Sequence, residues 1–149
     1  MADHVRKQIR AAAKTALTGL TTTGANAFAS RVYPLQDANL PALKITTPDE
    51  SSNLASMGMS NRYVERTMIL QVEGSVKELV NYEDTCDQIA KEVETALANN
   101  NTLGGLCKYI QIRSTSTKSS GEAEKPTAVI TMMFDVHYFT TLNAPDVPL

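Results

Sequence analysis

The segment "PTAVITMMFDVHYFTT" at residues 126–141 constrains the fold most strongly. Every second residue from Ala128 to Tyr138 is apolar, and the alternate positions include Val129 and Met133 among polar side chains. Successive side chains of a β-strand point to opposite faces, so neither face of this strand is suited to full contact with water. Such a strand either lies centrally in a sheet beneath two layers or faces another subunit. A fold built around a sheet is therefore expected.

Other segments have the patterns of strands and helices. The strands are expected at 27–33, 40–47, 62–74 and 106–115, and the helices at 3–20, with Asp3 as the N-cap, and 76–99. Gly74 is expected to begin the turn into the second helix. These elements predict one α+β domain over 1–149, with two helices packed on a mixed or mostly antiparallel sheet of about five strands, in the order α-β-β-β-α-β-β.

Three polar segments are expected to lie outside the regular elements. Residues 48–61 lack a period and predict a mobile loop or a long hairpin arm, and 116–125 predict a flexible hairpin tip. The tail from about residue 142 contains two prolines and is expected to be flexible and extended and to reach outward.

The totals of the sequence exclude several classes of function. The chain has 149 residues and a net charge of −2, so it lacks a global basic field that would concentrate nucleic acid or an anionic membrane. No apolar run approaches the roughly 18 residues of a membrane span, and the start of the chain lacks the apolar region of an export signal. We therefore expect synthesis in the cytoplasm and no membrane partner.

Residues that often carry chemistry do not form a recognised signature. Cys86 and Cys107 are isolated and predict two buried free thiols, and His4 and His137 have no metal-ligand spacing. Asp135 and His137 share a strand face, but no nucleophile at a sharp turn accompanies them. We expect them to make polar contacts on a half-buried face or at an interface. No catalytic, cofactor-binding or metal-binding residue is predicted.

The two predicted helices have opposite charge. Four basic side chains against one acidic side chain give +3 over residues 3–20, and two basic against six acidic give −4 over 76–99. The candidate contact residues are Arg6, Lys7, Arg10 and Lys14 on the first helix and Glu83, Asp84 and Asp87 on the second. Each set is either a solvated flank or a contact surface, which would pair within the subunit or head-to-tail between copies of a ring.

Two loops supply further candidates for an interface. Leu35 and Asp37 lie in a loop bounded by Pro34 and Pro41, which is either a stiff surface element or a plain connector. Three apolar residues, Leu54, Met57 and Met59, stand in the polar segment 48–61. They either fold back onto the domain or contact a neighbouring chain.

Four segments together resemble the tail-terminator family of long-tailed bacteriophages, such as the minor tail protein U of lambda-like phages. They are the opening helix "HVRKQIRAAAKTAL", the element "DANLPALKIT", the strand "YVERTMILQVEGSV" that leads into a helix, and the closing strand "TAVITMMFDVHYF". Their order and spacing cover most of the chain. The chain departs from the family pattern in a longer loop at 113–127 and in its proline-containing C-terminal tail.

The resemblance implies a structural virion protein, made in the bacterial host, that has no enzymatic activity and no cofactor. It would form a homohexameric ring on the finished tail tube, stop tube polymerisation and dock the head connector or neck protein. DNA would only pass through the ring, without sequence recognition. A neck or head-closure component, a tail-tube subunit and a small hydrolase remain as alternatives.

Overall fold

A computed structural model describes residues 3–29, 41–54, 62–77, 81–120 and 127–149. The elements within these ranges are α1 (Val5–Leu17), β1 (Ala27–Ala29), β2 (Ala42–Leu54), β3 (Tyr63–Val76), α2 (Tyr82–Asn99), β4 (Tyr109–Ser120) and β5 (Thr127–Thr141). The strands form one sheet in the order β1-β2-β3-β5-β4. β1 is parallel to β2, and the other neighbours are antiparallel. The predicted α+β fold, with its mixed sheet and its element order, is confirmed.

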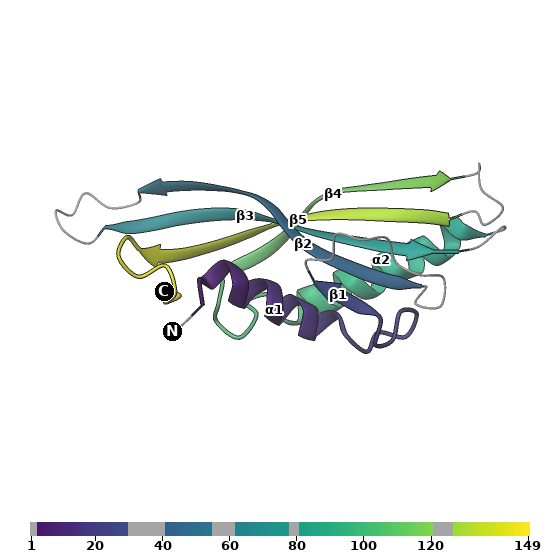
Figure 1. The fold of residues 1–149 in the computed structure, drawn as a ribbon, viewed down its shortest axis with the longest axis horizontal. Coiled ribbons are helices and arrows are strands. Elements are labelled where there is room, and N and C mark those ends of the chain that lie inside the picture. Colours follow the sequence, from purple (N-terminus) through teal and green to yellow (C-terminus); the bar gives the residue numbers. More distant parts are fainter. Residues whose placement is uncertain (1–2, 30–40, 55–61, 78–80, 121–126) are drawn as a thin grey trace.

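Both helices lie on the same side of the sheet (Figure 1). We call this side the helix face of the sheet, and the opposite side the outer face, which no described element covers in that view. The strands are long, and the β2–β3 pair extends at one end past α1. The sheet is therefore a platform with one packed face and one open face.

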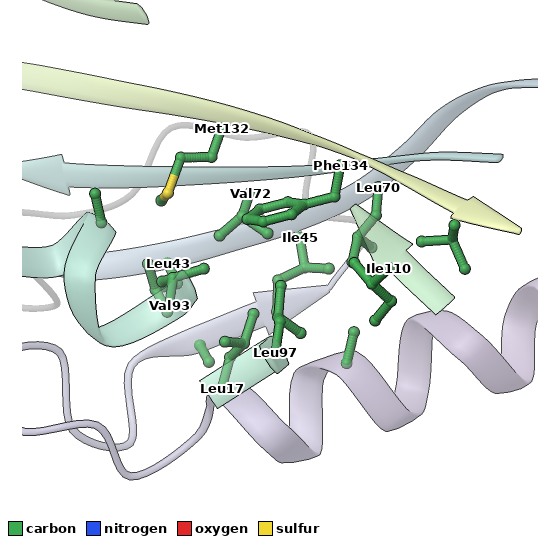
Figure 2. Packing of buried hydrophobic residues seen from close by; sticks show 14 of the residues in the cluster. Leu17, Leu43, Ile45, Leu70, Val72, Val93, Leu97, Ile110, Met132 and Phe134 are labelled. Atoms are coloured by element: carbon green, nitrogen blue, oxygen red, sulfur yellow. The ribbon is translucent and has the colours of Figure 1, made fainter. Parts of the chain in front are cut away.

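The core lies between the helices and the helix face. Every second residue of β5, from Ala128 to Tyr138, is buried, which confirms the alternation expected for this strand. The helices meet it with stripes spaced three or four residues apart, which are Val5, Ile9, Ala13 and Leu17 on α1 and Cys86, Ile89, Ala90, Val93 and Leu97 on α2. Figure 2 shows side chains from both layers converging around Phe134.

Two strands are longer than predicted. β2 continues to Leu54, and residues 49–54 pair with β3 after a register shift between Thr46 and Asp49. Of the two alternatives predicted for 48–61, the long hairpin arm is confirmed over this range and the mobile loop is wrong there. Pro48, which has no N–H to donate, sits in that irregularity. β4 begins at Tyr109 instead of residue 106 and continues to Ser120, into the predicted hairpin tip. Both extensions lie in polar, exposed segments that lack the alternation of a half-buried strand.

The link between β3 and α2 also differs from the prediction. β3 runs to Val76, and α2 begins at Tyr82 instead of residue 76. Gly74 therefore lies inside a strand and not at its turn. It is buried, and a Cβ atom at this position would be 2.9 Å from Cγ2 of Ile89 and 3.1 Å from Cγ2 of Ile130. Glycine is needed here because α2 packs directly against the backbone of β3.

The C-terminal tail returns along the domain instead of reaching outward. The backbone N–H of Val5 donates to the carbonyl of Pro145 at 2.9 Å, and the N–H of Leu149 donates to the carbonyl of Phe139 at 3.1 Å. The tail thereby satisfies one of the N–H groups that the first turn of a helix leaves without a helical partner.

Both cysteines are free and buried, as predicted. Cys86 lies on the buried stripe of α2, whereas Cys107 precedes β4 instead of opening it. Burial raises the pKa of Cys107 to about 11. Neither helix in the described part of the chain has the length and apolar character that crossing a membrane requires.

Candidate subunit interface

A buried carboxylate joins four elements of the fold. The side chain of Glu50, on β2, is 8% exposed and accepts hydrogen bonds from Arg6 Nη2 of α1 at 2.7 Å and from Arg66 Nη1 of β3 at 3.2 Å. The hydroxyl of Tyr138 on β5 donates to the same carboxylate. We call these four residues the Glu50 cluster. It fastens the start of α1 to the sheet.

The electrostatics of the cluster keep Glu50 ionised. Burial alone would raise the pKa of this carboxyl, but hydrogen bonds from Arg6 and Tyr138 and the charge of Arg6 together bring it below its usual range. The pKa of Tyr138 is raised by burial and by its hydrogen bond to Glu50, so its hydroxyl remains a donor. The two arginines balance a charge that would be costly to bury alone.

The basic stripe predicted on the first helix is therefore only partly a free surface. Arg6 finds its acidic partner within the chain, and Arg10 donates from Nη1 to Oγ1 of Thr47 at 2.9 Å. Lys7 pairs with Asp3 at 3.1 Å on the surface, and Lys14 is exposed. Arg6 does not pair with an acidic residue of the second helix, because its acidic partner, Glu50, lies on β2.

His4, and not the predicted Asp3, caps α1. Its Nδ1 accepts a hydrogen bond from the backbone N–H of Arg6 at 3.0 Å. Burial lowers the pKa of His4, and the positive charges of Arg6 and Arg66 lower it further. Protonation would remove the acceptor that caps the helix and add a positive charge beside two arginines.

Protonation of His4 is accordingly expected to lower the stability of the fold as the pH falls. The folded-state pKa lies below that of the unfolded chain, about 6.5, so this contribution is present above that pH and is lost as the pH falls through the folded value. Urea unfolding of the wild type and of His4→Asn, compared at pH 7.5 and pH 5, checks this. Asparagine also caps helices but does not titrate. A larger loss in the wild type is expected, and equal losses in the two proteins would contradict the role of His4.

The predicted acidic set on α2 faces solvent. Glu83, Asp84 and Asp87 are exposed, and Glu83 lies off the buried stripe. A different acidic residue of this helix makes an internal contact. Glu92 accepts a hydrogen bond from the backbone N–H of Thr22 at 2.8 Å, which ties α2 to the segment between α1 and β1.

Asp135 and His137 are each engaged by other residues on the outer face. His137 Nε2 is 3.1 Å from Oε1 of Glu65, and its ring stacks on Tyr109 with centroids 5.1 Å apart. Asp135 instead lies 3.7 Å from Nη1 of Arg113. The two residues are not joined as a base and its orienting carboxylate, and their contacts satisfy them on a half-buried face.

At each of its two edges, the sheet has a strand segment with one side that pairs with no other described strand. β4 forms one edge, and its residues 111–119 are exposed. At the other edge, β1 pairs only with Leu43 to Ile45, which leaves residues 49–54 of β2 with an unpaired side among the described strands. Unpaired backbone N–H and C=O groups are a template for a strand from another chain.

An apolar recess of about 360 Å³ borders the β4 edge. It lies where the end of α2 meets the sheet, and its apolar lining is Leu97, Ala98, Ile110, Ile112 and Phe134. Ile112 is 42% exposed, a large fraction for an isoleucine on the helix face. Three of these lining residues, Leu97, Ile110 and Phe134, also belong to the buried core that Figure 2 shows.

Of the candidate interface residues predicted in loops, the structure describes only Leu54. Leu54 lies at the end of β2, not in a loop, and is 48% exposed. Leu35, Asp37, Met57 and Met59 lie outside the described residues. Glu50, Arg66 and the β4 edge were not anticipated as features of interest. The sequence pattern placed Glu50 in a segment expected to be a loop or a hairpin arm, and it placed the end of β4 in a hairpin tip.

No protein-family model matches the chain, and no curated protein matches it at a significant level.

Proposed function

We propose that this chain is a structural subunit of a bacteriophage tail, a terminator whose copies form a ring on the tail tube. The ring stops tube growth and offers a docking surface to the head connector. The proposal starts from the four segments that resemble the tail-terminator family. One structural observation carries it further, namely that the sheet ends in two open strand edges of different charge.

The two edges suit head-to-tail association. β4 carries Arg113 and Lys118 and no acidic residue, whereas the exposed part of β2 carries Asp49, with the Glu50 carboxylate turned inward. When the surface of one copy meets a different surface of the next, the contacts repeat and close into a ring if the rotation allows. The resemblance implies six copies in that ring.

The open outer face provides a second surface for assembly. Val129 and Met133 of β5 and Ile69 of β3 lie there, half-buried, among polar side chains. This mixture of apolar and polar residues suits contact with another protein, since interfaces of that kind are about as apolar as the rest of a protein surface. The tail tube and the head connector are the partners that the proposal assigns to the ring.

The chemistry of the described residues supports a structural role over the hydrolase alternative. His137 is held by Glu65 and stacked on Tyr109, and Asp135 lies beside Arg113. Cys107, with a pKa raised to about 11, is a protonated thiol at neutral pH and a poor nucleophile. Each of these groups is committed to packing or to a polar neighbour.

A tube-growth assay tests the proposal. Purified protein is added to polymerising subunits of the cognate tail tube, and tube lengths are measured by negative-stain microscopy. Tubes are expected to stop at shorter lengths with a ring at one end. The neck alternative predicts unchanged growth, and the tube-subunit alternative predicts long cylinders of this chain alone, so either result would overturn the assignment.

A further inference from the structure

We infer that β4 of one copy pairs antiparallel with residues 49–54 of β2 of the next copy, with Leu54 of that copy covering the recess beside Ile112. The inference rests on the proposed ring and specifies the contact that builds it. The occupant of the recess is thus a second copy of this chain. Direction, side-chain faces, register and charge each support the pairing.

The direction of the strands agrees with a ring. β2, β3, β5 and β4 are successive antiparallel neighbours, so β2 and β4 run in opposite directions. Pairing Leu54 with Ile112 displaces the next copy along the strands by the six rows between Val64 and Leu70, so the ring axis is inclined to the strands, as in a β-barrel. A copy related by rotation about that inclined axis still presents its β2 antiparallel to β4. The backbone groups of both edges then pair, as in the addition of a strand to a sheet.

The faces of the two edges are also compatible. Leu54 pairs with buried Val64, and Ile112 pairs with buried Phe134, so both belong to the helix face. Leu54 keeps the face set by its pairing with Val64, so a slip of one residue would place it opposite Gln111, which belongs to the outer face of β4, and not opposite Ile112 beside the recess. Burial of Leu54 and Ile112 therefore selects the parity of the register.

One register satisfies both an apolar and a charged pair. β4 has one extra residue, Arg113, in the register shift between Ile112 and Ser114. When Leu54 is placed opposite Ile112 and this residue is allowed for, Asp49 falls opposite Lys118. Both of these side chains belong to the outer face, because their partners within the chain, Ile69 and Val129, lie there.

Charge disfavours the symmetric alternative. Two β4 edges paired with each other would give Lys118 no acidic residue to face, because β4 carries none. Like charges opposite one another destabilise a strand pair, whereas opposite charges stabilise it. Such a symmetric contact would also close a dimer and not a ring.

Cysteine cross-linking tests the register. Leu54→Cys protein is mixed with Ile112→Cys protein under mild oxidation, and the matched control mixes Asn53→Cys with Ile112→Cys. A disulfide-linked heterodimer is expected only in the first mixture, because Asn53 points to the opposite face and cannot meet the geometry of a disulfide. Native Cys86 and Cys107 are buried and remain in place. Equal yields in the two mixtures would overturn the register.

Charge reversal provides the second readout. Asp49→Lys in the first protein or Lys118→Asp in the second is expected to lower the cross-linking yield by a factor of about two to five, as one cross-strand charge pair predicts. Both changes together should restore the yield, and failure to restore it would contradict the Asp49–Lys118 contact. Cross-linking in register with unchecked tube growth would refute the proposed function alone. Capped tubes without this cross-link would refute the interface alone.

Discussion

Replacing Glu50 with alanine is expected to lower the free energy of unfolding by about 3 kcal/mol, as removal of one partner from a buried ionic cluster does. The substitution leaves Arg66, whose side chain is 13% exposed, and the hydroxyl of Tyr138 without their shared acceptor. It also releases Arg6 and thus the start of α1 from the sheet. Urea unfolding followed by circular dichroism measures the loss.

Arg6→Ala is the matched control from the same cluster. Arg6 is 39% exposed, and its removal leaves Glu50 with Arg66 and Tyr138 as partners, so a loss of about 1 kcal/mol is expected. A larger loss for Arg6→Ala than for Glu50→Ala would show that the carboxylate is not the centre of the cluster.

Replacing Gly74 with valine is expected to cost about 3 kcal/mol through overpacking. A Cβ atom at 2.9 Å from Cγ2 of Ile89 is closer than packed side chains tolerate, and Cγ2 of Ile130 closes the other side at 3.1 Å. The contacting atom of Ile89 is a methyl group on its branched Cβ, which cannot swing away without a change of rotamer. α2 must therefore move from the sheet.

The neighbouring position supplies the control for Gly74. Ser75→Val adds the same side chain on the outer face of β3, and its effect should stay within about 0.5 kcal/mol. Combining Gly74→Val with Ile89→Ala should cost less than the two separate losses together, because the second change removes the clashing methyl group. If the losses of the two single variants simply add in the double variant, the contact with Ile89 is not the cause of the effect of Gly74→Val.

Apolar periodicity explains which parts of the fold could be predicted. The alternation in β5 and the stripes of α1 and α2 reflect burial, and the order of apolar and polar residues in the sequence predicts which positions are buried. The edge segments of β2 and β4 are strands because a neighbouring strand pairs with their backbone, although most of their side chains are exposed on both faces of the sheet. Their Ser-rich sequences therefore read as loops.

The Glu50 cluster could not be predicted for a related reason. Its members come from four separate elements, and Glu50 lies in the segment predicted as a mobile loop or a hairpin arm. Arg6 was singled out as part of either a solvated flank or a contact surface, and an acidic partner for it was sought on α2 or on another copy. Gly74 carried the signal of a turn, and only the position of Ile89 shows that it marks close packing.

The most direct test of the account compares tube growth in the presence of the wild-type chain and of its Asp49→Lys variant. Asp49 is exposed, and within the chain its Oδ1 accepts a hydrogen bond from the backbone N–H of Glu50 at 2.8 Å, so the variant loses this surface contact as well as the charge at the edge between copies and should still fold. The account predicts that the wild type caps tubes with a ring at one end and that the variant needs more protein to do so. Tubes that reach the same lengths with and without the wild-type chain would contradict it.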